Sequence, residues 1–160
     1  CYAAKSLRTD ESILVDLCRK LDYIPVLFSA FQDVNGERLP IYHTNVMMCI
    51  AKDYAIICLD AIDNNVERSG VIKHLENNNK EIIEISELQA NQFAGNMLQV
   101  MGDKLYLVMS KSAFDSLNDN QISRIENYNE ILSVNLDIIE TCGGGSARCM
   151  MAEIFLPLRK

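Results

Sequence analysis

The hydrophobic pattern near the start of the chain is helical. After Thr9 and Asp10, polar residues fill the first turn, and apolar residues then recur every three or four positions up to Leu21. A polar cap followed by acidic residues and by this spacing is the usual beginning of an amphipathic helix. The pattern therefore predicts a helix over residues 10–21.

Short apolar runs separated by polar turns predict strands further along the chain. The first run covers residues 24–28 and is followed by a loop that carries Asn35-Gly36. Two more runs, 42–50 and 54–59, flank the polar turn Ala51-Lys52-Asp53, a pattern typical of a β-hairpin. We therefore expect an extended segment, a loop and a hairpin in this order.

A helix and a further strand complete this arrangement, which then recurs. Residues 66–76 favour a helix, and residues 81–85 alternate like a strand. The same order of strand, strand, helix and strand is predicted a second time, which indicates an internal repeat. The second set covers residues 96–101, 104–109, 112–128 and 131–134.

The period of the repeat is 51 residues, the offset from Asn45 to Asn96. A third unit begins with the apolar run from Cys149 to Phe155, so we expect extended chain there. Repeated units cover their open faces by packing on neighbours, and we therefore expect the missing modules of a ring to precede Cys1. The units are expected at about 41–86, 93–135 and, incomplete, 146–160.

Composition restricts the class of protein. The chain has 160 residues, 49% of them hydrophobic, which is enough for one core and predicts a single domain over 1–160. The net charge is −7 and the basic residues are scattered, which argues against a nucleic-acid partner. The apolar runs are too short to span a bilayer and the sequence does not open with a secretory signal pattern, so we expect no membrane partner.

The cysteines favour a reducing compartment. Six are present, without CxxC pairs or metal-like spacing, so we expect mostly buried thiols, no metal, no cofactor and a cytoplasmic location. A disulfide between Cys142 and Cys149 would fit the geometry of a flexible loop, but the expected compartment argues against it. Cys1 could alternatively be an amino-terminal nucleophile exposed by self-cleavage.

His43 is a candidate for proton transfer. A single histidine without metal-like company is more often a capping or core residue. In a ring of repeated units, however, the starts of the strands point at one centre, so His43, Asn96 and Cys149 should meet in space. An imidazolium near a thiol favours the thiolate, which is the stronger nucleophile.

The segment Thr141–Cys149 is rich in glycine. Its three successive glycines, Gly143-Gly144-Gly145, allow main chain to approach a ligand closely. A phosphate cradle is less favoured, because no Lys-Ser/Thr follows and the next segment reads as a strand. A wide loop in front of a buried cysteine is the structural alternative.

Three motifs together resemble the arginine deiminase and amidinotransferase superfamily, most closely its bacterial citrulline-hydrolase-like members. They are Tyr42–Asn45, Phe93–Leu98 and Gly143–Met150, and the resemblance covers nearly the whole chain. It implies an α/β fold, a partial α/β propeller of the pentein type built from ββαβ modules, with about half of a five-module ring in this chain. It also implies that Cys149 attacks a guanidino or ureido carbon while His43 transfers protons.

We assign the substrate contacts to Asn45, Asn96, Gly144 and Gly145. Many arginine-processing relatives carry Asp at the place of Asn45, and a neutral amide suits a ureido head, so we expect citrulline to be preferred over arginine. We treat Arg148, adjacent to the nucleophile, as structural, because neighbouring residues on a strand face opposite sides. Two acidic residues that flank the glycines, Glu140 and Glu153, remain unassigned.

A non-catalytic binding module is the rival function. A ribosome-binding translation initiation factor of similar architecture is an example of such a module. It has no need for both Cys149 and His43, so the sequence favours a hydrolase with a small-molecule substrate. The family's other acidic substrate-holding residues are expected before this chain, so this piece alone is predicted to be inactive, and a missing amino-terminal half or a homo-oligomer would complete it.

Overall fold

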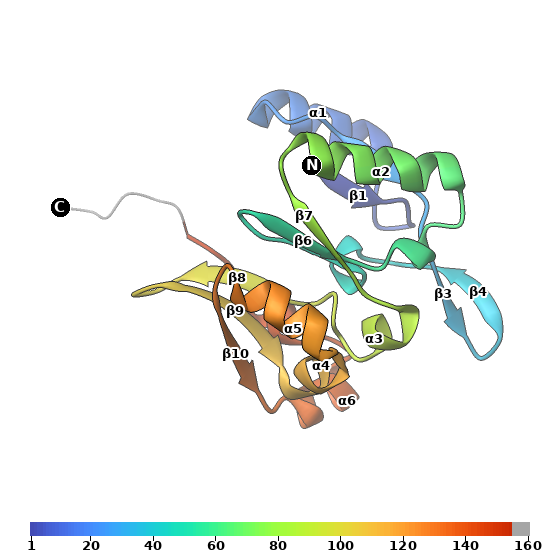
Figure 1. The fold of residues 1–160 in the computed structure, drawn as a ribbon. Helices are drawn as coiled ribbons and strands as arrows, with labels where there is room; N and C mark the ends of the chain where they lie inside the picture. The colour runs from blue at the N-terminus through green and yellow to red at the C-terminus, as the bar shows by residue number, and fades with distance from the viewer. Residues whose placement is uncertain (155–160) are drawn as a thin grey trace.

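Four small sheets and the helices between them form the part of the chain that the structure, a computed structural model, describes: residues 1–154 (Figure 1). Among these residues, none of the helices is long and apolar enough to cross a bilayer. The elements in chain order are β1 (Tyr2–Ala4), α1 (Glu11–Leu21), β2 (Val26–Phe28), β3 (Phe31–Val34), β4 (Glu37–Pro40), η1 (Thr44–Val46), β5 (Met48–Ile50), β6 (Tyr54–Ile57), η2 (Leu59–Ala61), α2 (Asn65–Asn77), β7 (Glu81–Glu84), α3 (Glu87–Asn91), β8 (Leu98–Met101), β9 (Leu105–Ser110), α4 (Lys111–Ser116), α5 (Asp119–Glu126), β10 (Glu130–Val134), α6 (Asp137–Gly143) and η3 (Ala147–Met150).

The two three-stranded sheets share one topology. In the order β5-β6-β7, the middle strand pairs antiparallel with β5 and parallel with β7, and the order β8-β9-β10 repeats this arrangement. A hairpin makes each antiparallel pair, and a helical crossover, α2 or α4 with α5, makes each parallel pair. Both units are therefore ββαβ, and within residues 1–154 they form no closed ring (Figure 1).

The first elements of the chain repeat the parallel half of the ββαβ arrangement. Strands β1 and β2 pair in parallel and are joined through α1, as β6 and β7 are joined through α2. The predicted helix over 10–21 is confirmed, with Asp10 as its cap. The Asp10 carboxylate accepts a hydrogen bond from the Ile13 amide at 3.0 Å.

Both predicted hairpins, β5 with β6 and β8 with β9, are confirmed, but a third was not expected. Asn35-Gly36, predicted as a loop, forms the turn between β3 and β4. Both residues have positive φ angles, 56° and 83°, which the two central residues of a type I′ turn require. Residues 35–36 therefore carried a hairpin signal that the loop prediction overlooked.

Two long elements were predicted wrongly. The expected strand over 42–50 begins only at Met48, because residues 44–46 form a 3₁₀ turn after His43. The expected helix over 112–128 is broken between α4 and α5, where the Asn118 side chain and Gln121 form a capping box. Each break follows a local hydrogen-bonding pattern that hydrophobic periodicity does not detect.

The extended run expected from Cys149 is wrong at its start. Cys149 lies inside η3, and residues 151–154 belong to no strand. Phe155, the end of that predicted run, lies outside the described residues. The short elements β1, α3 and α6 were not predicted, since each is too short to show a clear period.

One core spans both units. Strand β6 is buried along its whole length, and Val71 and Leu75 of α2 belong to the same buried cluster. A polar bridge crosses from this sheet to the next: the Tyr54 hydroxyl donates to Asn129 Oδ1 at 2.7 Å, and Gln99 Nε2 donates to the same oxygen at 2.8 Å. Buried polar atoms need such partners, so the bridge fixes how the two sheets lie relative to each other.

Candidate active site

One pocket of about 220 Å³ collects every residue that the sequence analysis proposed for the site. Its wall is formed by β3, the turn before β5, the end of α3 with the following loop, and the glycine segment with η3. His43 and Cys149, more than a hundred positions apart, both line it. The proposed residues on this wall are His43, Asn45, Asn96, Gly144, Gly145 and Cys149.

Two side-chain amides face the sulfur of Cys149. Asn96 Nδ2 lies 3.3 Å from Sγ, and Asn45 Nδ2 lies 3.7 Å from it. In the thiol form, Sγ can also donate to Asn96 Oδ1 at 3.5 Å. Amide N–H groups can hydrogen-bond an anionic sulfur, so the two asparagines provide donors for a thiolate at this position.

Asn96 is held where the two units meet. Its side chain is buried, and Nδ2 also donates to the Asn45 carbonyl at 3.1 Å. Gly95, the residue before it, presses on the backbone of the first unit: a Cβ there would lie 2.8 Å from the Met47 carbonyl carbon and closer still to the Val46 oxygen. Only glycine allows this approach, which brings Asn45 and Asn96 to the same sulfur.

The glycine segment shapes the turn that carries Cys149. Gly144 has a φ of 66° and ends α6, with its amide donating to the Glu140 carbonyl. A Cβ on Gly145 would lie 3.3 Å from Cys149 Sγ, so a side chain there would crowd the sulfur. The Cys149 amide donates to the Ser146 carbonyl at 3.0 Å, and the exposed sulfur is left open to the pocket.

The position of Arg148 needs a correction. Its structural role was inferred from a strand, but it lies in the 3₁₀ turn η3, where neighbouring side chains are not on opposite faces. The Arg148 amide donates to the Asn96 carbonyl at 3.4 Å, which links η3 to the second unit. The side chain does not line the pocket that contains Cys149.

His43 lies at the rim, just before η1. Thr44 Oγ1, the next residue, accepts from the Ala4 amide at 2.9 Å, and this contact ties the turn to β1. The imidazole is exposed, and its ring centroid lies 4.9 Å from that of Tyr42. His43 stands at the first cap position of η1, but its side chain makes no capping hydrogen bond and lines the pocket instead.

Arg8 is a site residue that sequence reasoning did not single out. Its Nη1 lies 3.3 Å from His43 Nε2, and its guanidinium lies 5.5 Å from the centre of the Tyr42 ring. No carboxylate among residues 1–154 forms an ion pair with Arg8. A guanidinium only donates, so Nε2 accepts this hydrogen bond when the imidazole is neutral, and the contact leaves a cation beside the pocket.

Six further residues on the wall were not predicted as site residues: Gln32, Tyr42, Val46, Ala90, Asn91 and Phe93. Phe93 has a φ of 64°, a conformation that is unusual for an aromatic residue and that recurs near functional sites. The sequence contains no pattern that identifies Gln32, because it comes from the hairpin that was predicted as a loop. No group of three or more His, Cys, Asp or Glu side chains among residues 1–154 could hold a metal ion.

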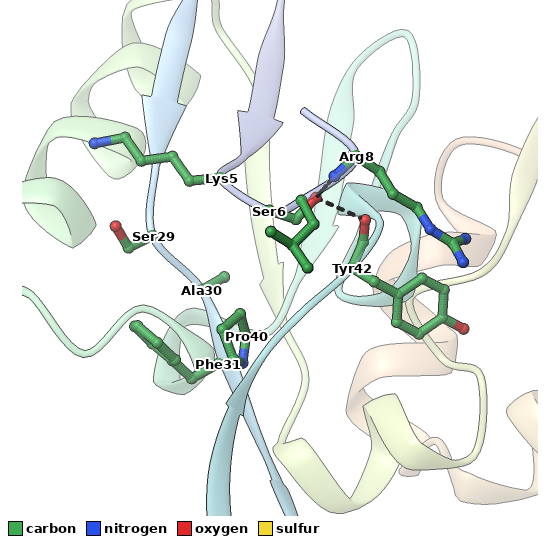
Figure 2. Close-up of a pocket in the computed structure, with 9 residues that line it drawn as sticks. Lys5, Ser6, Arg8, Ser29, Ala30, Phe31, Pro40 and Tyr42 are labelled. Carbon is green, nitrogen blue, oxygen red and sulfur yellow. Dashed lines mark hydrogen bonds between the residues drawn. The ribbon is translucent and has the colours of Figure 1, made fainter. Parts of the chain in front are cut away.

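A larger cavity of about 680 Å³ adjoins the site (Figure 2). It shares Tyr42 with the smaller pocket, and the Ser6 hydroxyl donates to the Tyr42 carbonyl at 3.1 Å. Arg8 extends beside the Tyr42 ring, whereas the ammonium of Lys5 points away (Figure 2). The larger cavity contains neither His43 nor Cys149, so the smaller pocket is the candidate active site.

Comparisons with solved structures show the fold. The apo structure of ArgZ, an arginine dihydrolase from the ornithine–ammonia cycle in cyanobacteria, matches with a TM-score of 0.69 and 16% identity over 93% of this chain. The ternary complex of AgrE with ornithine and NAD⁺ matches with a TM-score of 0.70 and 19% identity over 99% of this chain. An AgrE mutant with L-arginine matches with a TM-score of 0.68 and 19% identity over 93%. This chain spans about a fifth of each: 20%, 21% and 20% of their lengths.

The remaining comparisons concern sequence. A search of the curated proteins found no match. The family model described as eukaryotic N,N dimethylarginine dimethylhydrolase matches residues 1–156, which is nearly the whole chain. This match and the fold agree with the resemblance drawn from the motifs, while the closer likeness to citrulline-hydrolase-like members stays a prediction. The chain belongs to the N,N-dimethylarginine dimethylhydrolase family.

Proposed function

We propose that this protein hydrolyses the guanidino or ureido group of an arginine-like compound, with Cys149 as nucleophile and His43 as general acid and base. One observation carries the proposal. The sulfur of Cys149 has amide donors at 3.3 and 3.7 Å in a pocket that the imidazole of His43 also lines. Such a group of nucleophile, proton carrier and oriented donors is what a covalent hydrolase requires.

The proposed reaction has two halves. In the first, the Cys149 thiolate adds to the planar carbon, and His43 protonates the departing nitrogen as the carbon–nitrogen bond breaks. Ammonia or an amine leaves, and the carbon remains bonded to sulfur. In the second, His43 takes a proton from water, the hydroxide adds to the carbon, and the carbon–sulfur bond breaks. Thiolate and protonated His43 are then restored.

The wall of the pocket supports substrate contacts for the proposed reaction. Asn45 and Asn96 can each donate to and accept from the planar head group, and Gly144 and Gly145 leave room for it. Arg8 offers a cation next to His43, which suits the carboxylate of an amino-acid substrate. These steps use side chains alone, and we propose that the protein works without a cofactor in the reducing cytoplasm.

We place the two ββαβ units, about 41–86 and 93–135, in a five-module α/β propeller. The pocket residues among 1–154 include no carboxylate, whereas the family resemblance implies acidic groups around the substrate. Residues 1–160 alone are therefore expected to show no turnover. Further modules or a second copy would supply those groups.

Turnover tests the roles of the two residues. The protein, purified as its full reading frame encodes it, is assayed for amine release from citrulline, arginine and dimethylarginine. We expect Cys149→Ala to abolish release and His43→Ala to lower it about 10²–10⁴-fold, the usual contribution of positioned proton transfer. Cys142→Ser is the matched control, because this cysteine is exposed but does not line the pocket.

Two outcomes would contradict the proposal. Full activity of the Cys149→Ala protein would remove the covalent mechanism. Ligand binding without turnover of any guanidino or ureido compound would favour the rival, a non-catalytic binding module of the same fold. In that case the rate at which iodoacetamide alkylates Cys149 should match that of an ordinary exposed thiol such as Cys142.

Asn45 gives the test of substrate class. Its neutral amide motivates the preference for citrulline, whose ureido head is uncharged. In the present structure Asn45 Nδ2 lies 3.7 Å from Cys149 Sγ, so Asn45→Asp places a carboxylate beside the sulfur. The variant should raise kcat/KM for arginine relative to citrulline, because a carboxylate pairs with a guanidinium. If the unmodified protein turns over arginine faster than citrulline, this role for Asn45 is wrong.

A further inference from the structure

Both carboxylate oxygens of Glu140 are engaged by serine hydroxyls. Ser146 Oγ donates to Oε1 and Ser112 Oγ donates to Oε2, each at 2.5 Å. This is the length expected of a strong hydrogen bond from a hydroxyl to a carboxylate. Ser146 is fully buried, so its hydroxyl depends on this partner. Glu140 is therefore unlike a solvated surface carboxylate, the usual interpretation of such a residue.

The two serines belong to different parts of the site. Ser112 lies in the first turn of α4, and its hydroxyl lies 2.9 Å from that of Ser110, a buried residue at the end of β9. Ser146 lies at the end of the glycine segment, and its carbonyl accepts from the Cys149 amide at 3.0 Å. Glu140 thus connects the second unit to the turn that carries the nucleophile.

Glu140 also holds the other end of the glycine segment. Its backbone carbonyl accepts from the Gly144 amide at 3.2 Å, and this bond ends α6. The side chain and the main chain of one residue therefore fix both ends of the segment 144–146. Gly144 and Gly145 carry no side chain that could hold it otherwise, and a Cβ on Gly145 would lie 3.3 Å from the sulfur.

We propose that Glu140 is a positioning residue that sets where the Cys149 sulfur lies in the pocket, through Ser146 and the η3 turn. This inference rests on the proposed function, in which Cys149 is the nucleophile. Without the carboxylate, the buried Ser146 hydroxyl has no acceptor and the segment 144–146 has one anchor fewer. The sulfur then moves relative to the amides of Asn45 and Asn96.

Kinetics of the full-reading-frame protein test the proposal, with kcat normalised to the folded fraction measured by circular dichroism. Glu140→Ala should lower kcat about 10²-fold, the effect of misplacing a reacting group by about 1 Å, while KM changes by less than about threefold. Glu140→Gln keeps one acceptor oxygen and should stay within about tenfold of the unmodified protein. Glu126→Gln, at an exposed position at the end of α5, is the control and should behave as the unmodified protein.

A second variant separates positioning from loss of folding. Ser146→Ala breaks the same contact from the other side, so it should lower kcat as Glu140→Ala does, and the double variant should be no worse than either single one. If Glu140→Ala does not fold, Ser146→Ala alone decides. A purely structural role would lower the thermal midpoint and the folded fraction but leave the normalised kcat unchanged, which would overturn the proposal.

The two proposals fail in different ways. If Cys149→Ala retains activity, the proposed function is wrong and the positioning role falls with it. If Cys149→Ala is inactive while Glu140→Ala and Ser146→Ala keep the normalised kcat, only the role of Glu140 is wrong. If both lower kcat as expected and the Glu126→Gln control does not, the positioning role is supported.

Discussion

Replacing Gly95 by alanine would test how tightly the two units must meet at the site. Gly95 is buried, and its φ is not in the left-handed region, so alanine is allowed by backbone conformation alone. The obstacle is space. An added Cβ would lie 2.8 Å from the Met47 carbonyl carbon, 2.9 Å from its Cα, and nearer still to the Val46 oxygen.

These three atoms belong to backbone, so they cannot rotate away. Two carbon atoms normally stay about 3.5–4.0 Å apart, so the two segments must separate by roughly 1 Å. Overpacking of this kind costs about 1–3 kcal/mol, and the lower entropy of the unfolded alanine chain offsets about 0.4–1 kcal/mol of it. We expect a net loss of about 1–2 kcal/mol in the free energy of unfolding.

The same separation would pull Asn96 away from Asn45 and Cys149. A shift of about 1 Å at reacting groups can cost about 10²-fold in rate, so turnover should fall more than stability does. Urea unfolding measures the first effect and amine release the second. Gly70→Ala is the matched control: nothing lies within 4 Å of a Cβ there, and the residue is inside α2.

Alanine inside a helix is favoured over glycine by about 0.5–1 kcal/mol, so Gly70→Ala should stabilise the protein and leave its activity unchanged. The same chemical change is thus expected to have opposite effects at the two positions. If Gly95→Ala unfolds at the same urea concentration as the unmodified protein and retains full activity, the close approach of the two units is not what positions Asn96.

Two further predictions concern ionisable groups. The pKa of Glu81 is lowered by a hydrogen bond from the Tyr128 hydroxyl and, to a smaller extent, by Arg124. The ionised Glu81 carboxylate therefore stabilises the fold fully above about pH 4.3, the pKa of glutamate in an unfolded chain. This stabilisation is lost as the pH falls through the lower pKa of the folded state. The free energy of unfolding of Glu81→Gln, measured by urea titration, should therefore fall less between about pH 5 and pH 3 than that of the unmodified protein. An equal fall in both proteins would contradict this prediction. Burial raises the pKa of Cys49 to about 12 and of Cys58 to about 11, so iodoacetamide at about pH 8 should label neither until urea unfolds the chain. Mass spectrometry should find label first on the exposed thiols, which are those of Cys1, Cys142 and Cys149. Equal labelling of all six cysteines would show that the core opens readily and would contradict the prediction.

Elements whose cause is local could be predicted from the sequence. Helix α1 begins where Asp10 caps it, and the two hairpins lie between apolar runs, because these signals act within a few residues. Some local signals were present but overlooked, among them Asn35-Gly36 and the capping box that starts at Asn118. The strand expected from residue 42 failed because residues 44–46 form a 3₁₀ turn, a local break that periodicity does not detect. The close packing of Gly95, from a distant loop, against residues 46–47 could not be predicted either, because periodicity contains no information about such a contact.

The identities of the candidate residues came from motifs, but their roles depend on distances that motifs do not contain. The sequence alone determined the ββαβ order of the two units and named Cys149, His43, Asn45 and Asn96. Only the tertiary structure decided that these residues share one pocket, that Arg8 lies against His43, and that Glu140 accepts a hydrogen bond from Ser146 beside the turn that carries Cys149. The physical reason is that secondary structure follows from neighbours along the chain, whereas a site is made by packing segments that are far apart in it.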